Sequence, residues 1–99
     1  MVRIPIDRDR IADFCRRHHI RKLSFFGSVL RDDFTPESDV DVLVEFEPGH
    51  TPGLFGLSGM EREMSVLLGR KADVNTAGFL SKRYRDEVLL EAEQVYVAA

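Results

Sequence analysis

Cysteine, positive charge and long apolar stretches are all scarce in this sequence of 99 residues. Cys15 is the sole cysteine, which excludes a disulfide within the chain. The 14 Lys and Arg residues are outnumbered by 17 Asp and Glu residues, and this acidic balance disfavours binding to long nucleic acids. No stretch approaches the roughly 18 apolar residues of a membrane span, and residues 1–5 lack the apolar core of a signal peptide. We therefore expect a cytoplasmic protein with no membrane partner.

The composition is typical of a small globular domain, with 43% hydrophobic and 31% charged residues. The sequence contains no internal repeat and no linker long enough to divide the chain. We therefore predict one domain that spans residues 1–99. A domain of this size leaves much apolar surface exposed, which makes association with a second protein or a second copy physically reasonable.

Three segments show the spacing of apolar residues that is typical of amphipathic helices. Residues 7–18 are predicted to bury Ile11, Phe14 and Cys15. A second helix carries Leu57, Met60, Met64, Leu67 and Leu68 and is capped by Gly69. A last helix over residues 84–93 is predicted to bury Tyr84, Val88, Leu89 and Ala92. Between the first two, residues 29–33 are long enough for about one helical turn with Ser28 as its N-cap.

Short apolar or Val-rich runs predict strands between these helices. The clearest covers residues 39–46, and shorter ones cover residues 23–26 and 71–75, with an edge strand over residues 95–97. Helices and strands alternate along the chain. The expected fold is therefore α/β (α+β), with a short mixed sheet flanked by about four helices.

Basic and imidazole side chains gather at the end of the first predicted helix. The cluster consists of Arg16, Arg17, His18, His19, Arg21 and Lys22. It could bind phosphate, or it could be a solvated charged surface that complements the dipole at the helix end. The second interpretation is the more common for a charge run in this place.

Asp39 and Asp41 are two residues apart on the clearest strand, so their side chains project from the same face. Two carboxylates held close together repel each other, and a hard cation such as Mg²⁺ relieves that repulsion through oxygen ligands. The alternative is a solvated acidic strand end, which is the ordinary explanation for an isolated Asp-x-Asp pair.

Gly27 and Ser28 follow the first predicted strand and could cradle a polyphosphate. Gly27 has no Cβ to keep a phosphate away from the backbone, and Ser28 offers a hydroxyl and N–H groups at the start of a helical turn. The alternative is a plain glycine turn followed by a serine cap. The ten residues between Ser28 and Asp39 allow one turn and a return loop, so the glycine-serine pair and the carboxylates can face each other.

This Gly-Ser, ten-residue, Asp-x-Asp arrangement resembles the signature of the DNA polymerase beta-like nucleotidyltransferase superfamily. The chain length is similar to its minimal nucleotidyltransferase (MNT) members, whose small catalytic domain corresponds to a polymerase palm. The resemblance implies that Asp73 is a third catalytic acid and that Arg31 contacts phosphate. Asp32 departs from the family pattern, in which glycine is common at that position.

The resemblance implies catalysis by Asp39, Asp41 and Asp73, which would hold two Mg²⁺ ions, with ATP bound by Gly27, Ser28 and Arg31. It further implies transfer of AMP from ATP onto a hydroxyl of a partner protein, as the antitoxin of a HEPN/MNT toxin-antitoxin pair. A catalytically silent antitoxin that binds its toxin through apolar surface around Leu54, Phe55 and Leu57 is the alternative. Transfer to a small molecule such as an aminoglycoside is disfavoured, since such enzymes generally carry an additional substrate domain. No residue can be assigned to base preference or to the acceptor.

Overall fold

The computed structural model describes residues 2, 4–31 and 34–98 and contains three α-helices and four strands within them. Asp32 therefore lies outside the described residues. The elements follow one another as α1 (Arg8–Arg17), β1 (Ile20–Phe26), the short 3₁₀ turn η1 (Gly27–Leu30), β2 (Val40–Phe46), α2 (Leu54–Leu68), β3 (Ala72–Thr76), the 3₁₀ turn η2 (Ala77–Phe79), α3 (Lys82–Glu91) and β4 (Glu93–Val97). Among the described residues, no helix has the length and apolar character needed to cross a bilayer.

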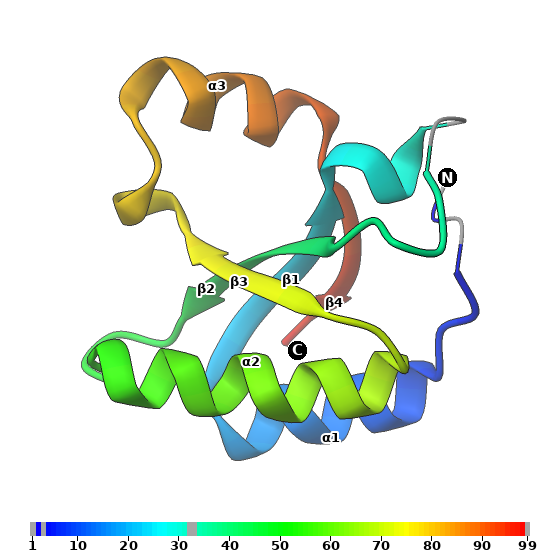
Figure 1. Ribbon diagram of the computed structural model, residues 1–99. Helices are drawn as coiled ribbons and strands as arrows, with labels where there is room; N and C mark the ends of the chain where they lie inside the picture. The colour runs from blue at the N-terminus through cyan, green and yellow to red at the C-terminus, as the bar shows by residue number, and fades with distance from the viewer. Residues whose placement is uncertain (1, 3, 32–33, 99) are drawn as a thin grey trace.

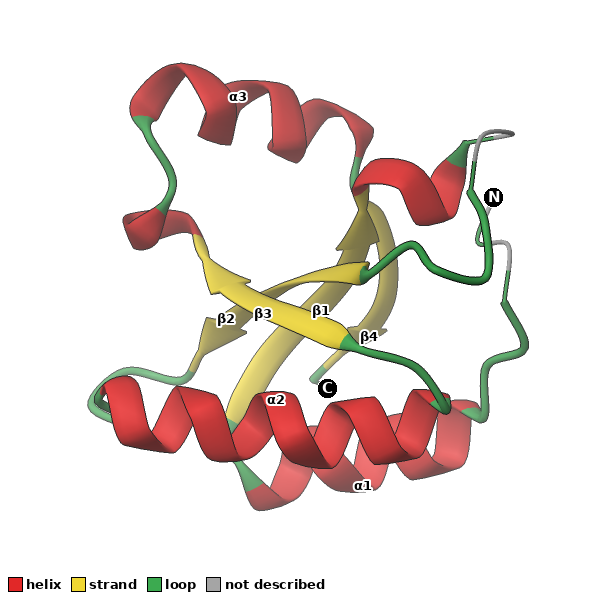
Figure 2. Cartoon of the chain, viewed as in Figure 1, coloured by secondary structure: helices red, strands yellow, loops and turns green. Residues whose placement is uncertain are grey.

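The four strands form one mixed sheet in the order β3-β2-β1-β4. β1 runs antiparallel to both β2 and β4, whereas β2 and β3 are parallel. Helices α1 and α2 lie side by side on one face of the sheet, and α3 lies over the other (Figures 1 and 2). The predicted α+β fold with a short mixed sheet is confirmed, with η1 in place of the fourth helix.

Alternation along β2 explains this layered arrangement. Val40, Val42 and Val44 are almost fully buried in the main core, which they form with residues of α1 and α2. Leu43, between them, belongs instead to a smaller cluster with Val88 of α3. Because successive side chains of a strand point to opposite faces, the main core must lie on one side of the sheet and α3 on the other. Asp41 alternates with the core valines and therefore faces the α3 side.

Helices α1 and α2 form as their sequence patterns predict. The Asp7 side chain caps α1 by accepting a hydrogen bond from the Arg10 N–H at 3.1 Å. The predicted core residues of α1, including the fully buried Cys15, are confirmed, and burial raises the pKa of the Cys15 thiol to about 12. Gly69 ends α2 in the left-handed region at φ 73°.

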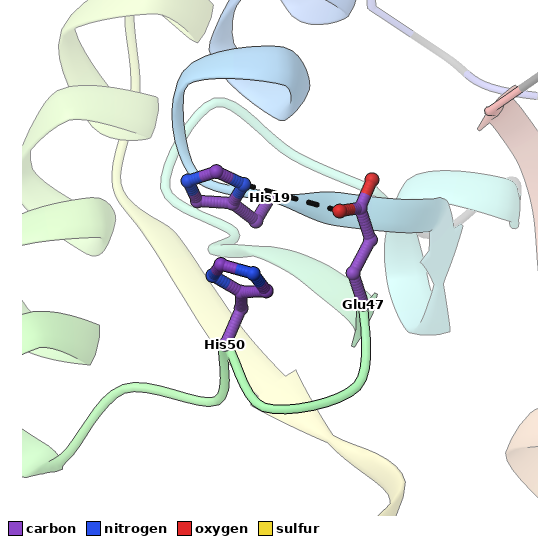
Figure 3. Close-up of side chains that lie close together, drawn as sticks. All are labelled: His19, Glu47 and His50. Carbon is purple, nitrogen blue, oxygen red and sulfur yellow. Dashed lines mark ion pairs between the residues drawn. The ribbon is translucent and has the colours of Figure 1, made fainter.

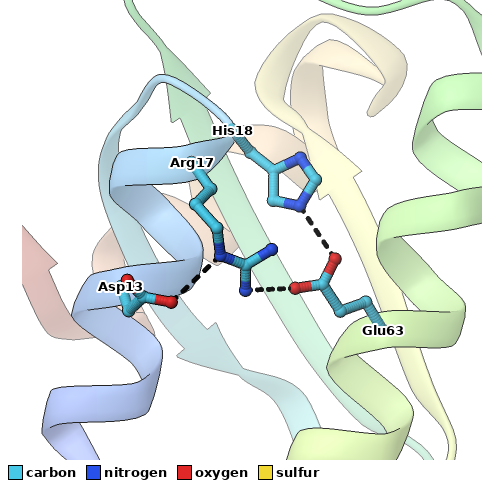
Figure 4. A network of polar contacts seen from close by, with 4 residues as sticks. All are labelled: Asp13, Arg17, His18 and Glu63. Atoms are coloured by element: carbon cyan, nitrogen blue, oxygen red, sulfur yellow. Dashed lines mark hydrogen bonds and ion pairs between the residues drawn. The ribbon is translucent and has the colours of Figure 1, made fainter.

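The basic cluster at the end of α1 makes ion pairs with acidic residues of three elements. Arg17 pairs with Asp13 on its own helix and with Glu63 of α2, and the His18 Nε2 atom lies 3.0 Å from the other Glu63 oxygen (Figure 4). Arg21 pairs with Glu45 of β2. These groups are exposed or partly exposed, so solvent screens the pairs and each contributes little to stability. These contacts agree with a charged surface rather than a phosphate site.

Several predicted boundaries differ from the structure. β4 begins at Glu93 rather than at residue 95, and η1 covers Gly27–Leu30 rather than residues 29–33. β1 begins at Ile20 rather than at residue 23, since the strand pairs with β2 from Ile20 onward. The sequence pattern missed this start because the charged Arg21 is exposed and interrupts the apolar run. The last helix begins at Lys82 behind the Ser81 N-cap, and it buries only part of the predicted face. Tyr84 and Leu89 are 47% and 55% exposed, whereas Val88 is buried.

Candidate active site

The structure brings the three predicted acids to one end of the sheet, on the face that α3 partly covers. Asp41 lies on β2 directly beside Asp73 of β3, its partner in the parallel register. Partners in a parallel pair point to the same face, and Asp39, two residues before Asp41, shares that face. Asp39 was predicted as the first residue of this strand, but β2 begins at Val40, so Asp39 lies just before it.

The three carboxylates are neighbours but are not drawn tightly together. A compact metal site would bring one ligand atom from each of three acidic, histidine or cysteine side chains within 4.8 Å of one another. Among the described residues, the three acids do not meet this limit, whereas one other group of side chains does. Like charges hold acids apart when no cation lies between them, so a looser arrangement is expected for three ionised carboxylates. Their oxygen donors suit a hard divalent cation, which would draw the three groups closer.

Asp41 is the most strongly perturbed of these acids. Partial burial and then the neighbouring Asp73 and Asp39 carboxylates raise its pKa to about 6, while the Arg31 guanidinium opposes the rise. A pKa raised by burial and like charge means that the folded protein disfavours the ionised form of Asp41. The site therefore carries excess negative charge at neutral pH, which a bound cation would neutralise.

This perturbation predicts that Asp41→Asn becomes more stable than the wild type as the pH rises. The Asp41 pKa is raised from 3.8 in the unfolded chain to about 6 in the fold, so its stabilising contribution is complete below pH 3.8 and is lost through pH 6. Allowing for solvent screening of this half-buried group, we expect a difference of about 1 kcal/mol at neutral pH.

Urea unfolding of both proteins between about pH 4 and pH 7 in EDTA measures this difference. Asp9→Asn, on the exposed side of α1, controls for the loss of one negative charge elsewhere. Equal stability of Asp41→Asn and the wild type at every pH would contradict the expected electrostatic cost.

Gly27 sits directly against the Asp41 carboxylate. Its φ of 76° lies in the left-handed region, and a Cβ built on it would lie 2.4 Å from the Asp41 Oδ2 atom. Phe26, the residue before it, is the β1 partner of Asp41. The predicted meeting of the glycine-serine pair with the Asp-x-Asp acids is therefore present in the fold.

The predicted N-cap role of Ser28 is wrong. The 3₁₀ turn η1 already includes Gly27 and Ser28, its cap position is Phe26, and no side chain caps it. The left-handed Gly27 turns the chain two residues earlier than the sequence pattern indicated, so Ser28 lies within the turn. Its carbonyl accepts the Arg31 N–H at 2.9 Å, and its side chain is half-buried beside the acids' end of the sheet.

Glu91, at the end of α3, is a site residue that the sequence pattern did not reveal. Its carboxylate accepts a hydrogen bond from the Gly27 N–H at 3.2 Å. Arg31 Nη2 also donates to both Glu91 oxygens, at 3.2 and 3.3 Å. An anion therefore already binds the backbone donor and the guanidinium that the sequence assigned to phosphate. No local signal marks Glu91, because it is 60 residues from Arg31 and reaches the site only through the packing of α3.

Glu61 of α2 is a second residue that the sequence pattern missed. Its Oε2 atom accepts the Val74 N–H of β3 at 2.8 Å, and one helical turn later Ser65 Oγ accepts the Ala72 N–H at 2.9 Å. Burial raises the pKa of Glu61 above its usual value, the Val74 N–H opposes this, and a contact with Asp73 adds to the rise. The sequence does place two polar residues, Glu61 and Ser65, one turn apart on the predicted helix, and this spacing was the available sign of a shared contact.

The comparisons with known proteins agree with this geometry. A sequence model described as a nucleotidyltransferase domain matches residues 8–96. A Methanocaldococcus jannaschii protein named as a candidate protein adenylyltransferase, MJ0435, is 33% identical over 86 residues, which cover 87% of this chain and 90% of that protein. The protein adenylyltransferase MntA of Thermococcus cleftensis is 35% identical over 81 residues, which cover 82% of this chain and 78% of MntA.

Solved structures share the fold. A structure described as a candidate minimal nucleotidyltransferase superposes with a TM-score of 0.71 at 35% identity, over 86% of this chain and 85% of that one. A toxin-antitoxin complex with AMP-PNP gives a TM-score of 0.77 at 16% identity, over 94% of this chain and 75% of that one. A complex of a tri-AMPylated Shewanella oneidensis HEPN toxin with an MNT antitoxin gives a TM-score of 0.63 at 15% identity, over 92% of this chain and 70% of that one.

These matches span most of the sequence, and the predicted resemblance and enzyme class are confirmed. The acids, the glycine turn and all of the sheet except Val97 lie within the matched residues. The chain belongs to the nucleotidyltransferase domain family.

Proposed function

We propose that this protein transfers AMP from ATP onto a hydroxyl group of a partner protein, and that it is the antitoxin of a HEPN/MNT pair in the cytoplasm. Residues 1–99 would act as a single domain. The observation that carries the proposal is the strand register that sets Asp41 beside Asp73 and against Gly27. This register supports a proposed cation site next to a proposed phosphate site.

The relatives favour a protein as the acceptor. Proteins named as adenylyltransferases match this chain at 33% and 35% identity. One structural neighbour contains a tri-AMPylated HEPN toxin beside its MNT antitoxin. The acidic surface charge and the small size of this chain also favour a compact acceptor over a long nucleic acid.

In this proposal, Asp39, Asp41 and Asp73 hold two Mg²⁺ ions. When bound, such ions neutralise the triphosphate and lower the pKa of the attacking hydroxyl. Gly27 donates its N–H to the phosphates, and Arg31 neutralises part of their charge. A bond forms between the acceptor oxygen and the α-phosphorus as the bond to the pyrophosphate oxygen breaks, so pyrophosphate leaves with the bonding electron pair and the hydroxyl proton passes to solvent. Positioning by these residues supplies most of the catalysis, because phosphoryl transfer needs little covalent help from the protein.

Glu91 must leave its hydrogen bonds before phosphate can take them. Its carboxylate occupies the Gly27 N–H and the Arg31 guanidinium, which are the donors assigned to the triphosphate. We predict that Glu91→Gln binds ATP about two- to fivefold more tightly, because it removes a competing charge whose partly exposed ion pair is worth about 0.5–1 kcal/mol. Isothermal titration with a non-hydrolysable ATP analogue and Mg²⁺ measures the change.

Glu87→Gln is the matched control, since Glu87 lies one turn earlier on the same helix and is exposed. It should leave the affinity for the analogue unchanged. Weaker binding by Glu91→Gln would mean that Glu91 assists the nucleotide instead of competing with it.

The function itself is tested by incubating the protein with its partner toxin, Mg²⁺ and ATP labelled either at the α- or at the γ-phosphate. Adenylyl transfer predicts that the partner keeps the α-label and does not acquire the γ-label. Label from γ-ATP alone would indicate a kinase, and would overturn the proposal.

The second candidate is a silent antitoxin that works by binding. One observation favours it: Leu54 and Phe55, at the start of α2, are 73% and 95% exposed. Leu57, predicted as part of the same surface, is buried in the main core and cannot contact a partner. Tight binding of the toxin without transfer of the α-label would favour this candidate.

A further inference from the structure

A second group of metal-binding side chains lies at the opposite end of the β1-β2 pair from the acids. His19 is in the turn between α1 and β1, while Glu47 and His50 are in the loop that joins β2 to α2. The two segments come together because Ile20, the first residue of β1, pairs with Phe46, the last residue of β2. Figure 3 shows both imidazole rings and the carboxylate gathered over this turn.

The backbone holds the three residues in this arrangement. The Glu47 N–H donates to the His19 carbonyl at 2.9 Å, and the His50 N–H donates to the Glu47 carbonyl at 3.1 Å. His19 has a φ of 56°, and is the sole non-glycine residue among those described with positive φ. This left-handed conformation is costly for a residue with a Cβ, and His, Asn and Asp adopt it more often than other residue types. The side chains therefore start from neighbouring, fixed points.

The ligand atoms of these residues are close together. One atom from each of His19, Glu47 and His50 lies within 4.8 Å of the other two, and no other three acidic, histidine or cysteine side chains among the described residues meet this limit. His19 Nδ1 is 3.9 Å from Glu47 Oε2. The two rings stack at 4.0 Å between centroids with 19° between their planes.

We propose that His19, His50 and Glu47 bind a late first-row divalent metal ion, with Zn²⁺ as the occupant. Two imidazoles and one carboxylate are donors that Zn²⁺ accepts, and three protein ligands leave a fourth position for water. Mg²⁺ is a poor match, since it prefers oxygen donors throughout. Nothing in the proposed transfer reaction uses these residues.

Small movements would complete the site. Zn²⁺ bonds of about 2.0–2.1 Å to nitrogen and oxygen place tetrahedral ligands about 3.4 Å apart, so the His19 and Glu47 atoms need to approach by roughly half an ångström. The stacked rings must also rotate, because nitrogen lone pairs lie in the ring planes and nearly parallel planes do not converge on one ion. The His19 side chain is 52% exposed and His50 is also exposed, so neither rotation disturbs the core.

The metal would join the turn before β1 to the loop before α2. These segments are 28 residues apart, from His19 to Glu47, and are linked here by one backbone hydrogen bond, one long ion pair and the stacked His19 and His50 rings. The site lies about 20 Å from the acids, the length of the six steps between Ile20 and Phe26 along β1. Binding would therefore stabilise the fold without entering the proposed active site.

Titration of the untagged full chain with Zn²⁺ tests the proposal. We expect one ion per chain at micromolar or lower Kd in the presence of millimolar Mg²⁺, and a rise in Tm of about 10 °C at Zn²⁺ concentrations well above Kd. His19→Ala and His50→Ala should each weaken binding at least about tenfold and remove most of the rise in Tm.

The remaining histidine of the chain provides a matched control. His18 is adjacent to His19 but contacts Glu63, so His18→Ala should leave Zn²⁺ binding unchanged. The double variant Asp39→Ala/Asp41→Ala should also bind Zn²⁺ as the wild type does. Binding at Zn²⁺ concentrations above about 100 μM only, or binding lost in the double variant and retained in His19→Ala and His50→Ala, would overturn the proposal.

Discussion

Asp41→Asn is expected to lower the rate of AMP transfer by about 10²-fold or more. Residues that only support a metal ligand cost about 10- to 100-fold when removed, and Asp41 is proposed to be a ligand itself. Asparagine keeps the size of the side chain but removes the charge that the cations would neutralise. Initial rates of α-label transfer at saturating ATP and Mg²⁺ measure the loss.

The same variant should be at least as stable as the wild type at neutral pH, because the raised pKa of Asp41 means that its charge destabilises the fold there. A loss of activity without a loss of stability is the expected sign of a residue kept for function. Asp9→Asn is the control for charge, and should transfer label at the wild-type rate. Wild-type activity in Asp41→Asn would remove the central acid from the proposed mechanism.

Gly27→Ala is expected to have the second-largest effect, with ATP affinity reduced about tenfold or more and a stability loss of about 1–2 kcal/mol. The new Cβ would lie 2.4 Å from the Asp41 Oδ2 atom, so the carboxylate must move away from the place where the cations are proposed to bind. Alanine also adopts the left-handed conformation of Gly27 poorly. Titration with an ATP analogue and urea unfolding measure the two effects.

Gly69→Ala separates the effect of the contact with Asp41 from the free-energy cost of placing alanine in a left-handed backbone conformation. Gly69 has a similar φ of 73°, but a Cβ there would meet nothing within 4 Å. It should lose stability and keep its affinity for the ATP analogue. If both glycine variants bound the analogue as the wild type does, the approach of phosphate to Gly27 would be contradicted.

The parts of the site that the sequence predicted are those set by local spacing. Alternation along β2 could be read directly, and it placed Asp39 and Asp41 on the face opposite the core valines. The pairing of Asp41 with Asp73 depends on the register between two strands about thirty residues apart. Local sequence patterns do not show which residues of two strands lie side by side, so Asp73 was predicted only through the family resemblance.

The helices show where such patterns fail. The spacing in α3 predicted burial of Tyr84 and Leu89, but both are exposed. Val88 packs in a small cluster with Phe26 and Leu43 of the sheet, and Tyr84 meets Phe26 edge-on. A helix that touches a small cluster buries a narrower stripe than the periodicity alone suggests. The same placement leaves the acids open and brings Glu91 to Arg31, a contact that depends on how α3 packs rather than on any motif.

The contacts of Glu61 and Ser65 with β3 also affect how the protein behaves at high concentration. β3 is an edge strand, and edge strands with free N–H groups can recruit extended segments of other molecules into amyloid-like aggregates. Here the Ala72 and Val74 N–H groups are already hydrogen bonded to α2 side chains. Helix α2 thus shields this edge from intermolecular strand pairing, and self-association by sheet extension is disfavoured on this side of the molecule.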